Sequence, residues 1–284
     1  MDNESIAYIE LFGVTLSGVK APTDGLYWTE LEGWWGLPDL KSNSDSIPGA
    51  HGSFRRHYSY RESRSITLTG HILADSNAGL VAVRDRLERA LSSSVDGVMR
   101  VVTTSYGAWS RTVEVDTLEI EPDHGRSYTK FTVDMVANDP IRYMDGVMIG
   151  PVGLPVKHGG LRLPKRFPWN FGDGRTLARI IVHNTGSAPL YPTVFVSGGF
   201  STLVVRDLTG GSSLEYGAPV ESGQQITLDS RNSQAVIGGR SVTRNMTRRE
   251  WFEIPPGESH TFEFRVTGRV GDPMMSIWYE IGAW

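Results

Sequence analysis

A β-strand that ends at mid-chain constrains the fold of this chain more than any other feature of its sequence. Residues 128–143 read YTKFTVDMVANDPIRY, in which Phe131, Val133 and Met135 alternate with more polar residues. This period of two is typical of a strand with one apolar face. Pro140 then ends the strand, because it has no N–H to donate to a sheet. A complete β unit is therefore predicted to close near the middle of the chain.

A Gly/Pro-rich stretch and a second β-patterned region follow this unit. Residues 144–172 contain four prolines and repeated glycines, which exclude long regular elements. Beyond them, short apolar runs alternate with turn signals, a spacing typical of a β-sandwich or jelly roll. We therefore predict a mainly β chain of three parts: a β domain over 1–143, a hinge over 144–172 and a β-sandwich over 173–284.

The first domain is predicted to contain one helix, over residues 77–91. Its apolar residues recur at the spacing of a single helical face, and Ser76 or Asn77 can cap its first turn. This apolar stripe consists of Leu80, Val83, Leu87 and Leu91. Strands are predicted around it at 26–32, 66–72, 98–103 and 112–120. The expected product is a β unit with one packed helix.

Composition and charge exclude several classes of protein. The chain has no cysteine, so it forms no disulfide and no thiolate metal site, in keeping with a reducing cytoplasm. The first ten residues lack the pattern of a secretory signal, and the apolar stretch 147–156 is too short to cross a membrane. Residues 1–143 carry 14 Lys and Arg against 20 Asp and Glu, and residues 144–284 carry 14 against 12. Neither half has the basic balance of a nucleic-acid binder.

Motifs for catalysis or for cofactor binding are missing from the sequence. The seven histidines show no spacing typical of metal ligands, and neither a nucleophile elbow nor a phosphate-binding loop is present. We therefore expect no catalytic residue, no metal and no cofactor.

Carboxylates cluster in the segment RTVEVDTLEIEPD. The apolar partners change phase within it, so a bulge near Asp116–Thr117 would bring four carboxylates onto one strand face. These candidates are Glu114, Asp116, Glu119 and Glu121. Paired carboxylates are also what a glycoside hydrolase requires, but a solvated strand face accounts for them more simply.

Tryptophans suggest a second candidate site. Trp34 and Trp35 fall in a long predicted loop over 33–53, where they form the better exposed cluster, and they suit a binding patch or a subunit interface. Replacing both with Ala is expected to impair assembly while each domain still folds. Trp251 and Trp278 lie in strand patterns and are expected in the core or between domains.

The order of several motifs resembles that of the distal tail proteins of long-tailed bacteriophages. In the first half they are WTELEGWWGLPD, the segment 48–52, YRESRSITLTGHI, LVAVRDRLERAL and the A-x-D-P-x-x-Y ending of the mid-chain strand. GGLRLPKRFPW follows in the hinge, and the second half adds segments 184–186, 192–198, 228–229 and 251–257. The resemblance covers nearly the whole chain.

This resemblance implies a structural role at the phage tail tip, in the virion, after assembly in the host cytoplasm. The first domain would be a split-barrel-like β domain related to tail-tube subunits, and the second a galectin-like β-sandwich. A homo-hexameric ring would surround the DNA channel, and DNA would pass without specific binding. Its partners would be the tail tube protein, the tape measure protein and tail-tip proteins, with no membrane. Glu114, Asp116, Glu119 and Glu121 would face the channel, and Trp34 and Trp35 a subunit interface.

Two rival functions come from other classes. A carbohydrate-binding protein could attach to the host surface through its C-terminal sandwich, in which case a row of exposed tryptophans is expected there. A β-sandwich glycoside hydrolase would instead use one of the carboxylate pairs.

Overall fold

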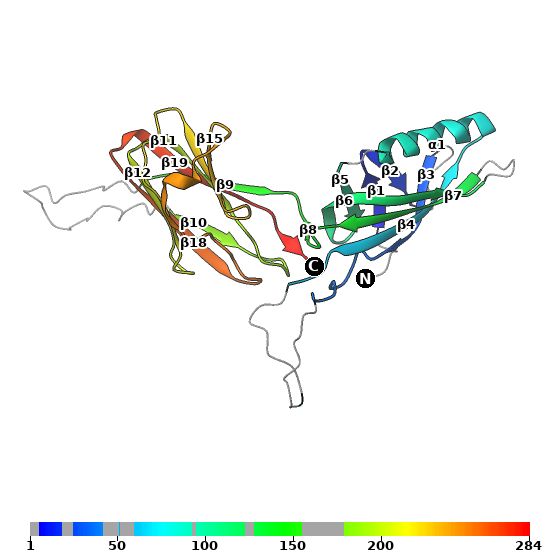
Figure 1. The fold of residues 1–284 in the computed structure, drawn as a ribbon, viewed down its shortest axis with the longest axis horizontal. Helices are drawn as coiled ribbons and strands as arrows, with labels where there is room; N and C mark the ends of the chain where they lie inside the picture. The colour runs from blue at the N-terminus through cyan, green and yellow to red at the C-terminus, as the bar shows by residue number, and fades with distance from the viewer. Residues whose placement is uncertain are drawn as a thin grey trace, which may run out of the picture. The chain divides into compact units, whose positions relative to one another are not determined.

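The computed structural model describes residues 6–18, 25–41, 51, 60–92, 95–122, 128–154 and 179–284. The chain divides into two compact units, one of Met1–Asp145 with Ala283–Trp284 and one of Gly146–Gly282 (Figure 1). The described residues form many strands and one α-helix. The prediction of a mainly β fold is confirmed.

The first unit is built on a closed barrel of seven strands. Its strands are β1 (Ile6–Leu11), β2 (Val14–Ser17), β3 (Gly25–Glu32), β4 (Arg64–Leu73), β5 (Gly97–Thr103), β6 (Gly107–Ile120) and β7 (Tyr128–Ala137). The order β6-β5-β1-β2-β3-β4-β7 closes because β6 pairs with β7 as well as with β5. Two short strands, β8 (Arg142–Tyr143) and β20 (Gly282–Ala283), extend from β6.

The hairpin of β1 and β2 was not predicted from the sequence. Its two-residue turn, Phe12–Gly13, has positive φ at both residues, as a tight hairpin requires. Ile9, Leu11 and Leu16 of this hairpin are fully buried. The hairpin therefore supplies part of the barrel core.

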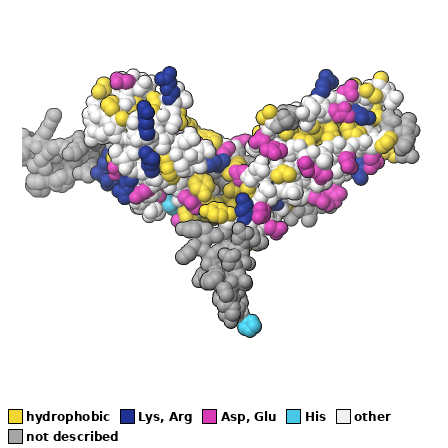
Figure 2. Space-filling view, viewed as in Figure 1, with side chains coloured by type: hydrophobic (Ala, Val, Ile, Leu, Met, Phe, Trp, Pro, Cys, Tyr) yellow, Lys and Arg dark blue, Asp and Glu magenta, His cyan; other side chains and the backbone are white. Residues whose placement is uncertain are grey.

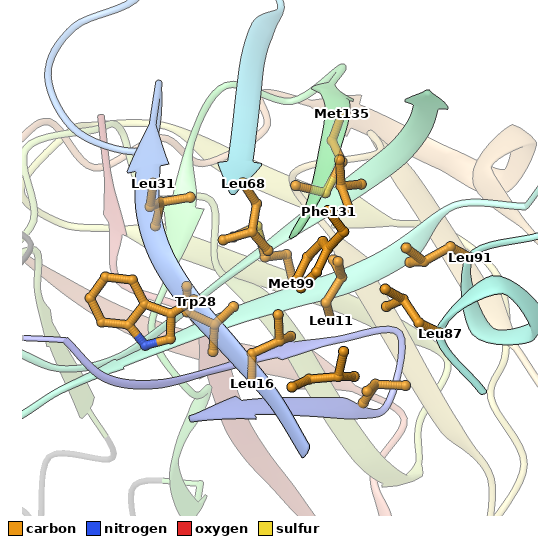
Figure 3. Close-up of a cluster of buried hydrophobic side chains, with 14 of the residues drawn as sticks. Leu11, Leu16, Trp28, Leu31, Leu68, Leu87, Leu91, Met99, Phe131 and Met135 are labelled. Carbon is orange, nitrogen blue, oxygen red and sulfur yellow. The ribbon is translucent and has the colours of Figure 1, made fainter. Parts of the chain in front are cut away.

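The helix α1 (Asn77–Leu91) has the predicted bounds. Ser76 caps it by accepting a hydrogen bond from the backbone N–H of Gly79 at 3.1 Å. Leu80, Leu87 and Leu91 are buried in the barrel core. Figure 3 shows Leu87 and Leu91 of α1 together with core side chains of the barrel strands, Phe131 and Met135 among them.

The second unit is a sandwich of two antiparallel sheets. One sheet has the order β10-β18-β12-β13-β17, with β10 (Arg179–His183), β18 (Ser259–Thr267), β12 (Thr202–Asp207), β13 (Ser213–Tyr216) and β17 (Met246–Arg249). The other has the order β16-β15-β14-β11-β19-β9, with β16 (Arg240–Ser241), β15 (Gln234–Ile237), β14 (Gln225–Asp229), β11 (Thr193–Gly199), β19 (Val270–Tyr279) and β9 (Val147–Gly153). A 3₁₀ turn, Thr243–Asn245, precedes β17. Phe262 and Phe264 are buried, as the alternation in β18 predicts.

Strand β9 lies within the range expected to form a hinge. It contains Pro151, which is tolerated because β9 is the last strand of its sheet. Gly150 adopts φ +108° there, and a Cβ at this position would lie 2.8 Å from the Met275 carbonyl oxygen. Residues 155–172 of the expected hinge are outside the described part of the chain.

Among the described helices, none combines the length and the apolar character that crossing a membrane requires.

Candidate functional site

The predicted bulge is present in β6. The pairing of β6 with β7 shifts register between Val115 and Thr117. Val113 before the bulge is buried, and Leu118 after it packs against the same core. The extra residue at the bulge keeps the carboxylates that follow it, such as Glu119, on the outer face of the barrel. The exposed set at this surface is Glu114, Asp116, Glu119 and, directly after the strand, Glu121.

Two of these four carboxylates have partners. Glu114 accepts a hydrogen bond from the Asn138 side-chain amide at 2.9 Å. A side-chain hydrogen bond with Asp96, and the negative charge of that residue, raise the pKa of Glu114. Glu121 lies 3.8 Å from the Lys130 ammonium group. Within the described chain, the other two carboxylates have neither a hydrogen bond nor an ion pair.

The acidic surface extends beyond β6 in two rows of paired positions that cross β3, β4 and β7. The first row is Glu30, Thr69, Thr132 and Glu119, and the second row is Glu32, Thr67, Asp134 and Thr117. We call these eight positions the acidic rows. Asp134 is held by hydrogen bonds from Thr67 at 2.7 Å and from Thr117 at 3.0 Å. The two rows together hold four carboxylates and four threonines, with no Lys or Arg among them. Figure 2 shows acidic side chains over the surface of this unit.

Trp34 belongs to the barrel core and not to an exposed cluster. It follows Gly33, which has φ +72°, and a Cβ on Gly33 would lie 2.1 Å from the Ser65 carbonyl oxygen. Trp34 is 0% exposed. The guanidinium of Arg111 lies 4.6 Å from the centroid of the Trp34 ring and donates a hydrogen bond to the Trp34 carbonyl at 2.7 Å. The prediction that both tryptophans are exposed is therefore wrong for Trp34.

A second arginine fixes the same turn. Arg64, at the start of β4, donates hydrogen bonds to the carbonyls of Gly33 at 2.7 Å, Trp35 at 2.9 Å and Gly36 at 2.6 Å. Because hydrogen bonds from a charged donor are stronger than neutral ones, these contacts stabilise an irregular turn against the barrel. The rest of the predicted loop, apart from residues 37–41 and 51, lies outside the described residues.

A third arginine extends this group of cations. Arg142 lies 4.8 Å from the Trp35 ring centroid and 5.2 Å from that of Trp109. Burial and the positive charge of Arg64 lower the pKa of Arg142 to about 10. Burial and the charges of Arg64 and Arg142 lower the pKa of Arg111 to about 9, although Asp139 acts in the opposite direction. We define the arginine–tryptophan cluster as Arg64, Arg111, Arg142, Trp34, Trp35 and Trp109.

None of these arginines was predicted to be a site residue, although two of them carry a signal in the sequence. Arg64 is in phase with the inward residues Ile66 and Leu68, and Arg111 is in phase with Val113. An arginine at an inward strand position predicts a buried cation.

The sandwich contains a buried histidine between carboxylates. His260 Nδ1 lies 2.6 Å from Asp207 and its Nε2 lies 3.2 Å from Glu258. Asp207 also accepts hydrogen bonds from the backbone N–H groups of Thr209 and Gly210, both at 3.0 Å. Both ring nitrogens are thus occupied, which suits a structural role better than proton transfer to a substrate.

No exposed tryptophan row is found on the described part of the sandwich. Trp251 and Trp278 are both partly buried, and Trp251 packs against the core of this unit. In the described residues, no group of three or more His, Asp or Glu side chains could hold a metal ion.

Comparison with known proteins identifies the fold. No family model matches the chain, and no curated protein matches its sequence. Among solved structures, the Dit protein of phage SPP1 aligns over 98% of both chains with a TM-score of 0.65 and 13% identity. That protein is described as a paradigm of the hub adsorption apparatus in phages that infect Gram-positive hosts. A chain of the phage P2 baseplate in its activated conformation with Ca aligns over 96% of this chain and 97% of its own, with a TM-score of 0.51 and 11% identity.

These likenesses define a class of protein by its fold. Barrel and sandwich both match, in one alignment that spans almost the whole of each chain. The chain has the two-part fold seen in SPP1 Dit and in the P2 baseplate chain.

Proposed function

We propose that this chain is a distal tail protein, a structural hub at the tail tip of a bacteriophage virion. The observation that carries the proposal is the alignment with SPP1 Dit across both units and 98% of both chains. In this role the chain is not an enzyme. It forms a ring, with six copies as the proposed number, between the tail tube and the tip proteins, and the tape measure protein contacts it during assembly.

The acidic rows are the proposed lining of the DNA channel. DNA carries a dense row of phosphates, and a lumen with Lys and Arg would bind them and retard passage. The four carboxylates of the acidic rows repel phosphates, and none of the eight positions donates a charged hydrogen bond. This assignment adds Glu30, Glu32 and Asp134 to the four carboxylates predicted to face the channel, which are Glu114, Asp116, Glu119 and Glu121.

Native mass spectrometry and negative-stain images of the full chain test the ring. We expect a six-fold ring at micromolar concentration. A protein that stays monomeric over that range, or a ring with the acidic rows on its outer perimeter, would contradict the proposal.

A charge reversal tests the lining. Glu30→Lys with Glu119→Lys should make the ring retard a short duplex DNA in a gel-shift assay at low salt, while the wild-type ring does not. The matched control is Glu221→Lys with Glu253→Lys, since both residues are exposed in the sandwich and the change of charge is the same. Equal retardation by both variants would mean that the rows do not face the DNA.

A further inference from the structure

The arginine–tryptophan cluster contains hydrogen-bond donors without acceptors. Arg111 is 1% exposed, and its Nε and Nη2 have no partner among the described residues. Arg64 Nε and the Nε and Nη1 of Arg142 are likewise shielded from water and unpaired in the described chain. A buried donor left unpaired costs about 1–3 kcal/mol, and more when the group is charged. The described residues therefore leave the cluster short of acceptors.

The charge of the cluster is also unbalanced. The charge of Arg64 lowers the pKa values of Arg111 and Arg142, and the charge of Arg142 lowers that of Arg111 further. The carboxylate that opposes them is Asp139, and its oxygens already accept hydrogen bonds from the backbone N–H of Ile141 at 3.0 Å and the Tyr143 hydroxyl at 2.7 Å. Cations taken out of water need opposite charge nearby.

We propose that Arg142 binds a carboxylate side chain of a second copy of this chain. The inference rests on the proposed ring and assigns a chemical role to one of its contacts. The Arg142 guanidinium lies over the rings of both Trp35 and Trp109, which reduces the entropy lost when it binds. Because its Nε and Nη1 are shielded from water, a carboxylate of a neighbour would bind through the Nη2 group, by a charge-assisted hydrogen bond. Tryptophan and arginine are among the residues enriched in binding hot spots.

Charge complementarity favours a second copy over nucleic acid as the occupant. Residues 1–143, which carry the cluster, have a net charge of −6. A DNA backbone would be repelled by that field, whereas one Asp or Glu of a neighbour is attracted to a local site of positive charge. A head-to-tail contact in a ring joins two different surfaces of the subunit, and these can carry opposite charge.

Arg142→Glu in the full chain tests this contact. We expect subunit association, measured by sedimentation and native mass spectrometry, to weaken at least about tenfold, because two carboxylates would then face each other. Arg244→Glu is the matched control, since Arg244 is exposed in the sandwich and the change of charge is identical. Should Arg142→Glu fail to fold, Arg142→Met keeps the size of the side chain and removes the charge, and the same weakening is expected.

Photo-crosslinking identifies the occupant directly. Benzoylphenylalanine in place of Met144, two residues from Arg142, should link two copies of the chain. Mass spectrometry of mixed light and heavy copies should find a peptide that contains Asp or Glu. A wild-type monomer would overturn both the ring and this contact. A wild-type ring that Arg142→Glu leaves intact, or crosslinks to other tail proteins only, would overturn this contact alone.

Discussion

The two units of the chain differ in how many of their buried polar side-chain atoms have a hydrogen-bond partner. In the sandwich, Asn184 is fully buried, and its amide donates to the carbonyls of Ala188 and Ile254, both at 2.9 Å. In the described residues, eleven buried side-chain nitrogen or oxygen atoms have no partner, and ten of them lie in the barrel unit. Because native proteins pair nearly all buried polar atoms, the described part of the sandwich is close to complete, with Ser230 Oγ as its one unpaired atom. The described part of the barrel carries ten buried atoms that find no partner among the described residues.

Of the variants that test this contrast, Trp34→Ala should lower the free energy of unfolding most. Trp34 is fully buried and stacks on Arg111, so its removal leaves a large cavity and an uncovered cation. We expect the free energy of unfolding of the barrel to fall by about 3–5 kcal/mol, measured by urea titration with circular dichroism. Trp35→Ala, at a partly buried site, should cost clearly less. Equal costs would mean that the two tryptophans are not divided between core and surface.

Leu87→Ala tests the helix face of the barrel. Leu87 is 0% exposed in the core under α1, so the cavity should cost roughly 2–5 kcal/mol. The exposed Val81 on the same helix is the control, and Val81→Ala should change stability by about 0.5 kcal/mol or less. A loss below about 0.5 kcal/mol for Leu87→Ala would place this face outside the core.

Asp207→Ala tests the completeness of the sandwich. It would leave His260 and two backbone N–H groups without their acceptor, so we expect a loss of about 2–4 kcal/mol in thermal or urea unfolding of this unit. Asp229→Ala removes a carboxylate that holds a partly exposed turn through Asn232, and should cost about 1 kcal/mol. Similar losses for both variants would mean that the buried hydrogen bonds of Asp207 stabilise the sandwich no more than those of an exposed turn do. The sandwich would then not depend on its buried polar pairs, as the contrast with the barrel assumes.

Arg142→Met should have the smallest effect on the stability of a single copy. No hydrogen bond of Arg142 is lost within the described chain, and relief of repulsion from Arg64 offsets the lost contacts with the indole rings. We expect a change within about 1 kcal/mol in the unfolding of dilute, unassembled protein. A loss above about 2 kcal/mol would show that the barrel, like the sandwich, uses its polar groups for its own stability.

Most of the fold could be predicted because local patterns decide it. The bounds of α1 follow from a Ser cap and an apolar stripe, and the bulge in β6 follows from the change of phase at Asp116. The hairpin of β1 and β2 was missed because its turn is Phe12–Gly13, without the usual Asn or Asp before the glycine. Strand β9 was missed because a proline is compatible with a strand only at a sheet edge, and edges are set by tertiary pairing.

The candidate site was only partly predictable, for a physical reason. The outward direction of Glu114 and Glu119 follows from strand period alone. The burial of Trp34 depends on Arg111, which lies 77 residues further along the chain. Long-range contacts of this kind leave no local pattern around the tryptophan. The local sequence, a Trp-Trp pair flanked by glycines, therefore predicts an exposed loop, and this prediction is wrong for Trp34.

The closed barrel has a consequence for how copies of the chain would come together in the proposed ring. Since β6 pairs with β7, the seven barrel strands close on themselves, and the sheet ends at β20, a strand of two residues that offers a neighbour little edge to pair with. Each barrel can therefore finish folding alone, and association becomes a reversible step governed by concentration and by side chains. Assembly could then be adjusted through surface residues by evolution or by design, without any cost to the folding of the subunit.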